Sequence, residues 1–168
     1  MSEQNKPALL TFQMKHEDFY YLGVEFKRGS VDYWNEFDKM GGWQVITKYQ
    51  KTPYEGAMMT IWQYNDPENQ IYFPGRIVEN VDNVPEGFTL KKFSACEFII
   101  ITTEWVNGSV WSGSAQTALE NKDNAQLIPD GYERYGGSEN LITLIERENQ
   151  NAESGNRYEV WVPIRRSE

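Results

Sequence analysis

EFKRGSV, at residues 25–31, returns as EWVNGSV at residues 104–110, 79 positions further along the chain. In both copies an apolar run rich in β-formers precedes the motif (FYYLGV and ACEFIIITT), and a helix-like run follows it (VDYWNEFDKM and VWSGSAQTAL). A strand, a Gly-Ser turn and a helix used twice indicate an internal repeat. The chain is therefore predicted to fold as a pseudo-symmetric domain with a cleft where its halves meet.

Alternation of apolar residues and turn signals between them place the remaining elements. The predicted strands cover residues 12–28, 56–64, 70–79, 88–105, 132–147 and 157–164, with a break near Ser94 and a polar loop over 148–156. The stretch 80–87 (NVDNVPEG) is interpreted as the seam between the halves. Each half then reads strand, helix, strand, strand.

The predicted fold class is α+β. Two pseudo-symmetric strand-helix-strand-strand units, at about 12–79 and 88–165, are expected to form one mostly antiparallel sheet with both helices on one face and a central cleft. Residues 1–168 form a single domain in this interpretation, because each half is small for an independent core, and residues 1–11 are expected to be a flexible tail.

Composition narrows the classes of partner. The 168 residues carry a formal net charge of -9, which disfavours nucleic acid and attracts small cations, although an acidic surface also serves solubility alone. One Cys and one His argue against a disulfide framework, a zinc site or a His-dependent triad, so no metal or cofactor is expected. No stretch approaches the length of a membrane span, and a cytoplasmic protein is expected.

Three carboxylates stand out because they interrupt apolar or aromatic strands: Glu97, Glu133 and Glu159. A buried and unpaired carboxylate is costly, and an arriving cation would neutralise it. Aromatic faces also attract cations directly. Each Glu is equally compatible with the solvated face of a strand, and Arg134 or Arg157 could pair with neighbouring acids across strands. The sequence leaves these two alternatives open.

The chain's second half resembles a known family. GYERY, a strand, a loop and then YEVWVPI are similar to the ending of gyrase-inhibitory-protein-like (GyrI-like) domains, which are also the effector-binding domains of AraC- and MerR-type multidrug regulators. PEGFTLKKFSACEFIIITTEW followed by a helix extends the likeness. The residues that carry it are Tyr132, Glu133, Tyr135, Glu159, Pro163 and Ile164.

The resemblance implies two strand-helix-strand-strand units around a central cleft, which agrees with the internal repeat. It also implies that Glu133, after Tyr132, faces a cationic ligand, with Tyr135 beside it and Glu159 opening the last strand. Further ligand-binding candidates are Tyr21, Trp43, Trp62, Glu97 and Trp105. The sequence shows no helix-turn-helix segment, so a stand-alone effector-binding domain is expected.

Three functions compete. The leading hypothesis is binding of a small amphipathic, cationic aromatic molecule, without turnover. The second is hydrolysis of strained electrophilic compounds, as in some proteins that resemble this family, with Glu133 as general base and Tyr132 or Tyr135 as its acid partner. This is less favoured, because no His is available to share the proton transfers. The third is a protein-interaction module with a protein partner.

Overall fold

The computed structural model describes residues 6–29, 32–49, 58–63, 68, 70–111, 113–136, 142–151 and 153–168. Its strands are β1 (Leu9–His16), β2 (Phe19–Gly23), β3 (Phe26–Lys27), β4 (Met58–Gln63), β5 (Ile71–Val78), β6 (Thr89–Phe93), β7 (Cys96–Thr103), β8 (Tyr132–Arg134), β9 (Ile142–Asn151) and β10 (Gly155–Arg166). Its helices are α1 (Tyr33–Lys39), α2 (Gly42–Ile46), α3 (Ser114–Glu120) and the 3-10 helix η2 (Ala125–Leu127).

Within these residues the strands form one sheet, in the order β1-β7-β10-β9-β4-β5-β2-β6, with β3 beside β5 and β8 beside β10. Every pairing between these strands is antiparallel. This order is symmetric. If it is read backwards and each strand is exchanged with its counterpart in the other half (β1 with β6, β2 with β7, β4 with β9 and β5 with β10), the same order results. The predicted α+β class, with a mostly antiparallel sheet, is therefore confirmed.

The register of the outer strands follows the sequence repeat. β1 pairs with β7 and β6 pairs with β2, so the first strand of each half lies in the sheet of the other half. A shift of 79 residues converts the pair Leu10↔Thr102 into the pair Gly23↔Thr89. The two halves are thus interlocked by exchange of their leading strands.

The repeated motif forms a turn in both halves. Gly29 has a φ of 78° and Gly108 a φ of 96°, a left-handed backbone that glycine adopts without a steric penalty. The Ser30-Val31 part of the first motif lies outside the described residues. After it, the side chain of Asp32 accepts a hydrogen bond from the Asn35 amide and caps α1.

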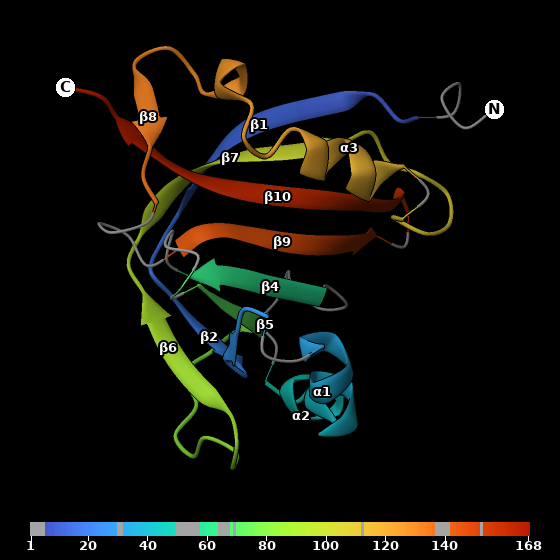
Figure 1. Cartoon of the computed structure of the whole chain (residues 1–168), viewed down its shortest axis with the longest axis vertical. Coiled ribbons are helices and arrows are strands. Elements are labelled where there is room, and N and C mark those ends of the chain that lie inside the picture. Colours follow the sequence, from blue (N-terminus) through green and yellow to red (C-terminus); the bar gives the residue numbers. More distant parts are fainter. Residues whose placement is uncertain are drawn as a thin grey trace.

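The sheet buries apolar side chains on both faces. One face carries the cluster Phe19, Tyr21, Met59, Ile61, Phe73, Ile77, Phe93, Phe98, Ile100, Ile142, Ile145 and Trp161. The other face carries the helices, with α3 against β7 and β10, and with α1 and α2 against β5. Figure 1 shows β9 and β4 between these two helical regions. The helices therefore leave the centre of this face to side chains alone.

Three predicted boundaries are corrected. Residues 9–11, expected in a flexible tail, belong to β1, because β7 offers them a complete antiparallel partner. The stretch 12–28, expected as one strand, contains the end of β1 and the whole of β2 and β3. The polar stretch 148–156, expected as a loop, extends β9 and β10 into a long hairpin, because ladder pairing overrides a polar composition. The predicted strand residues 56–57, 64 and 137–141 lie outside the described residues.

Among the residues described, no helix is long and apolar enough to cross a membrane.

Candidate functional site

Aromatic and acidic side chains gather over β4 and β9, between the two helical regions. They come from α1, from the central strands and from the segment before α3. We call this group the aromatic–acid cluster, and it comprises Tyr33, Trp34, Trp62, Tyr72, Trp111, Glu146, Glu148 and Tyr158.

Glu146, on β9, lies at the centre of the cluster. One carboxylate oxygen accepts a hydrogen bond from the indole Nε1 of Trp62 at 2.6 Å, and the other accepts one from the hydroxyl of Tyr158. Burial raises the pKa of Glu146 above its ordinary value, and the two donors and the Lys122 charge only partly offset this. The carboxylate is thus held in a fixed position with its charge poorly solvated.

Aromatic rings from α1 and β5 form one wall. The ring centroids of Tyr33 and Tyr72 lie 4.8 Å apart, and those of Tyr72 and Trp62 lie 5.2 Å apart. Trp34 continues the wall at 5.0 Å from Tyr33. The pKa of Tyr33 is raised, first by burial and then by the Glu146 charge, so this phenol stays neutral at physiological pH.

The opposite wall comes from β10 and the segment before α3. Trp111 packs on Tyr158 with 5.1 Å between ring centroids, yet Trp111 remains 62% exposed. Glu148, two residues beyond Glu146 on the same strand face, also has a pKa raised by burial. Trp111 is thus an exposed indole at the edge of the cluster, beside the Glu148 carboxylate.

A lysine ammonium lies close to the cluster. The Nζ of Lys122 is 5.8 Å from the ring centroid of Trp62, and it also bonds the neighbouring Asp123 carboxylate at 2.6 Å. Asp123 lines a hollow of about 190 Å³ together with Leu144, which pairs with Trp62 across the β4–β9 ladder. The Lys122 ammonium itself shows that a cation can lie over the face of Trp62 near Glu146.

Of the residues singled out by the family resemblance, Pro163 lines this hollow, whereas the acidic and aromatic ones lie outside the aromatic–acid cluster. Glu133, in β8, forms an exposed ion pair with Arg165 at 3.2 Å, and the Arg165 guanidinium also stacks on Tyr135. Tyr132 carries Arg166 over its ring. Since Glu133 pairs with Arg165 in the ladder, it lies about 23 Å along β10 from Tyr158, at roughly 3.3 Å per residue. That Glu133 contacts a ligand stays a prediction.

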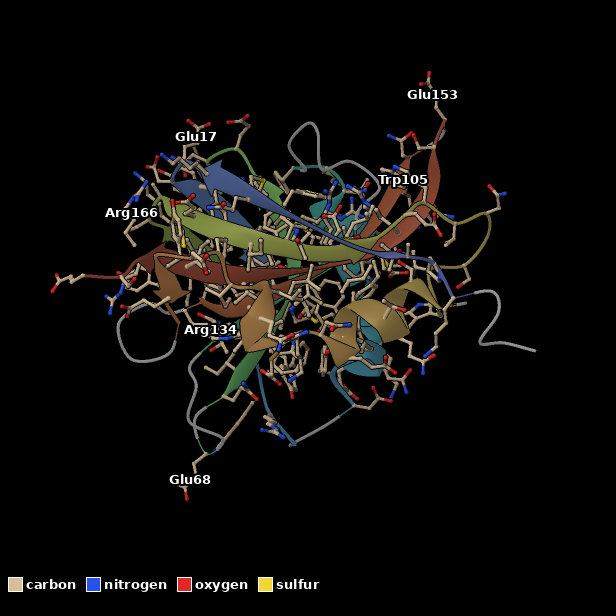
Figure 2. The ribbon with its side chains drawn as sticks, turned by 90° about the horizontal axis from the view of Figure 1, so that it is seen from above. Glu17, Glu68, Trp105, Arg134, Glu153 and Arg166 are labelled. Carbon is tan, nitrogen blue, oxygen red and sulfur yellow. The ribbon has the colours of Figure 1, made fainter. Side chains whose placement is uncertain are left out.

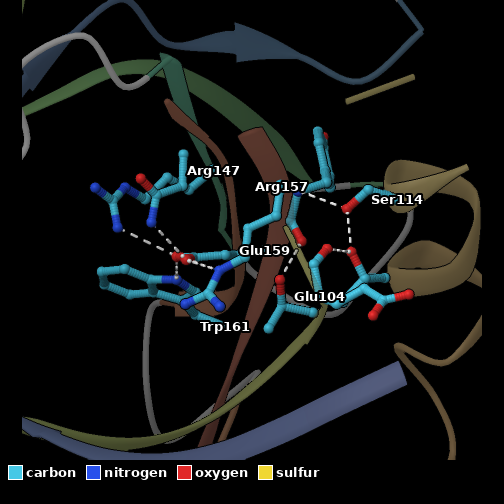
Figure 3. A network of polar contacts seen from close by, with 10 residues as sticks. Glu104, Ser114, Arg147, Arg157, Glu159 and Trp161 are labelled. Atoms are coloured by element: carbon cyan, nitrogen blue, oxygen red, sulfur yellow. Dashed lines mark hydrogen bonds and ion pairs between the residues drawn. The ribbon is translucent and has the colours of Figure 1, made fainter. Parts of the chain in front are cut away.

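Glu159 is buried on the opposite face of the sheet from Tyr158, because neighbouring strand residues alternate. Its carboxylate bonds Arg147 at 3.2 Å and Arg157 at 3.3 Å, and it accepts a further hydrogen bond from the Trp161 indole at 3.0 Å (Figure 3). This carboxylate already has its cations within the chain. Of the two alternatives that the sequence leaves open, pairing with a neighbouring Arg is therefore the one that applies to Glu159.

The remaining candidates are scattered. Tyr21 is fully buried and donates to the Phe73 carbonyl, and Glu97 accepts from Gln13. Trp105 lies under the Arg157 guanidinium at 4.1 Å. Figure 2 places Trp105 well apart from Arg134 of β8, so the candidates do not share one site.

Of the predicted residues, Trp62 lies inside the aromatic–acid cluster and Trp43 adjoins it through Trp34, with ring centroids 5.9 Å apart. The residues predicted from the sequence do not include Glu146, which lies within a predicted strand, or Glu148, which lies in the predicted loop 148–156. A signal was present in ITLIERE, at residues 142–148, where an apolar strand acquires two acids at a spacing of two residues.

The described residues hold no group of three or more His, Cys, Asp and Glu side chains that could bind a metal ion.

Comparison with known proteins places the fold. No protein-family model matches the chain, and no curated protein sequence matches it. Among solved structures, SAV2435 bound to tetraphenylphosphonium is similar with a TM-score of 0.64 and 8% identity, over 93% of this chain and 94% of that one. A transcription regulation protein from Staphylococcus aureus MU50 gives 0.61 and 7%, over 93% and 98%.

The C-terminal domain of EcmrR is also similar, with a TM-score of 0.55 and 10% identity over 95% of this chain and 99% of that domain. At these identities the likeness establishes the fold. That fold fits a GyrI-like effector-binding domain, as the resemblance in the second half of the sequence implied.

Proposed function

We propose that the aromatic–acid cluster binds a small amphipathic, cationic aromatic molecule, with Glu146 as the counter-charge. The position of the Glu146 carboxylate carries this proposal. It is held by Trp62 and Tyr158 at the centre of aromatic walls, and burial raises its pKa. A cation placed there relieves a poorly solvated charge and stacks on aromatic faces.

The solved structures support the choice of ligand class. The effector-binding fold is shared with SAV2435, which was solved with tetraphenylphosphonium, a cation surrounded by four aromatic rings. The net charge of -9 favours the approach of any cation. The rings of Tyr33, Tyr72 and Trp62 offer the stacking surface that such a compound requires.

The test is a titration with tetraphenylphosphonium, followed by tryptophan quenching and calorimetry. Triphenylphosphine oxide serves as a neutral aryl analogue and tetraphenylborate as an anion of the same shape. The wild type is expected to prefer the phosphonium. Glu146→Gln, which keeps the shape of the side chain, is expected to weaken phosphonium binding roughly tenfold or more, the equivalent of losing about 1.4 kcal/mol of charge interaction.

Glu133→Gln is the matched control, because it also removes one carboxylate but from an exposed ion pair on β8. It is expected to bind like the wild type. Equal binding of phosphonium, oxide and borate would contradict the proposal. A loss in Glu133→Gln with none in Glu146→Gln would move the site to β8, where the family resemblance puts it.

Hydrolysis is a second candidate, and one contact favours it. The hydroxyl of Tyr158 donates to the Glu146 carboxylate, which places an acid and a base side by side. In such a reaction Glu146 would take a proton from a water whose oxygen bonds to a ring carbon, and Tyr158 would give its proton to the ring atom released as the strained bond breaks. The proton on Glu146 would then return to Tyr158 along their hydrogen bond. Incubating the protein with a large excess of an electrophilic strained-ring compound distinguishes the two functions. Multiple turnovers support hydrolysis, and one equivalent bound without breakdown supports binding.

A further inference from the structure

Thr60 forms part of the floor of the aromatic–acid cluster. Its neighbours on β4, Met59 and Ile61, belong to the apolar core on the opposite face of the sheet, so the Thr60 side chain points to the face of the cluster. It lies directly opposite Glu146 in the β4–β9 ladder. Side chains at such positions have Cβ atoms only about 4.5–5.5 Å apart.

Thr60 is only 1% exposed, and its buried hydroxyl has no hydrogen-bond partner in the described part of the chain. On its other side the ladder partner is Pro74, whose side chain can neither donate nor accept a hydrogen bond. The two oxygens of Glu146 are occupied by Trp62 and Tyr158. A buried hydroxyl without a partner destabilises a protein, and valine fills the same space without this penalty.

We propose that the Thr60 hydroxyl and the Glu146 carboxylate together recognise the N–H group of a protonated amine. The ligand class is then an aromatic amine that carries a proton, in preference to a quaternary ammonium or phosphonium ion. This inference rests on the proposed function, because it names the kind of cation that the same site selects.

The chemistry of the two groups fits a protonated amine. An ionised carboxylate offers about four acceptor positions, and the described contacts use two of those of Glu146. A protonated amine donates to one of the remaining positions, while a second N–H or a bound water reaches the hydroxyl of Thr60. Since Thr60 is only 1% exposed, side chains of the cluster move aside when this N–H or water reaches its hydroxyl. A quaternary ion has the charge but no donor, so it leaves the hydroxyl without a partner.

The test uses two salts with the same ring system, linker and charge: 10-(3-methylaminopropyl)phenothiazine, whose ammonium carries two N–H groups at pH 7, and the corresponding trimethylammonium salt, which carries none. The carbon analogue without the amine serves as the neutral reference. Affinities are measured by calorimetry for the wild type and for Thr60→Val and Thr60→Ser. The wild type is expected to bind the protonated amine about tenfold more tightly than the quaternary salt, as for a hydrogen bond to a charged group.

Thr60→Val is expected to bind the amine about as weakly as the quaternary salt, while its affinity for the quaternary salt is unchanged. Thr60→Ser, which restores a hydroxyl, is expected to recover the preference. Thr143→Val is the matched control, because Thr143 on β9 has the same kind of buried hydroxyl without a partner in the described residues but faces the hollow beside Asp123. Thermal unfolding of Thr60→Val at or above the wild-type temperature excludes misfolding as the cause.

The inference is overturned if Thr60→Val keeps the wild-type ratio of amine to quaternary affinity, or if the wild type shows no preference between the two salts. The failure of the proposed function has a different signature. In that case both salts bind no better than the neutral carbon analogue. The site then has no preference for a cation, and its preference for an amine over a quaternary salt is lost as well.

Discussion

Glu146 is a single residue whose ionisation links stability to binding. Burial raises its pKa, so the folded protein holds this proton more tightly than the unfolded chain does. The resulting stabilisation is complete below the unfolded-state pKa near 4.5 and is lost as the pH rises through the higher folded-state value. At neutral pH the Glu146 charge therefore opposes folding, and a bound cation compensates for it.

The first prediction concerns pH. Phosphonium affinity is expected to fall as the pH decreases through the raised pKa of Glu146, by up to about tenfold per pH unit. The contribution of Glu146 to the free energy of unfolding should show the opposite trend and rise as the pH decreases. The free energy of unfolding of Glu146→Gln should exceed that of the wild type most at pH 7 and least at pH 4. Calorimetry and urea denaturation across this range measure both, and a pH profile of Glu146→Gln that matches the wild type would contradict the assignment.

Glu133 and Glu159 each interrupt an aromatic strand, and this property is visible in the local sequence. Whether a carboxylate meets an arginine depends on neighbouring strands, and these supply Arg165 to the first and Arg147 to the second. Glu146 differs because its neighbours on β4 and β10 bring it the neutral donors of Trp62 and Tyr158.

At the scale of elements, α3 is fastened to the sheet through Ser114, its first residue. The Ser114 hydroxyl is fully buried, accepts a hydrogen bond from the Tyr158 amide at 2.9 Å, and shares one with the Thr103 hydroxyl at 2.6 Å. Figure 3 shows this contact beside the Glu159 network. The helix is thus joined to the strand residue that holds the Glu146 carboxylate.

The second prediction is that Ser114→Ala lowers the free energy of unfolding by about 1–3 kcal/mol, because the buried Tyr158 amide is left without an acceptor. Ser109→Ala is the control. Ser109 accepts from the Trp111 amide at an exposed position, and its loss should cost less than about 0.5 kcal/mol. Urea denaturation measures both variants, and equal effects would show that Ser114 does not anchor α3.

At the scale of the whole molecule, the halves are interlocked. β1 completes the sheet beside β7, and β6 does the same beside β2. The apolar core on the face without helices draws on both halves as well, with Tyr21 and Phe73 from one and Phe98 and Trp161 from the other. We therefore expect that neither half buries its apolar surface without the other.

The third prediction follows from this exchange. Fragments 1–84 and 85–168, cut in the connection between β5 and β6, are each expected to be unfolded alone and to fold when mixed in equal amounts. Circular dichroism and size-exclusion chromatography measure this. Cooperative melting of either fragment as a monomer would show instead that a half is an independent domain.

The repeat, the alternation of strands and helices and the antiparallel sheet could be predicted from the amino-acid sequence, because they follow from local periodicity and from glycine turns such as Gly29 and Gly108. Which carboxylate meets arginines and which meets neutral donors depends instead on how the strands pair in the folded protein. Glu146 faces two aromatic donors because β9 pairs with β4 at this register. On β10, the partner of Glu146 is Val160, and the preceding residue, Glu159, points to the opposite face of the sheet, where it meets two arginines. A shift of one residue moves a side chain to the other face of a sheet, and the sequence of a single strand does not encode its neighbours.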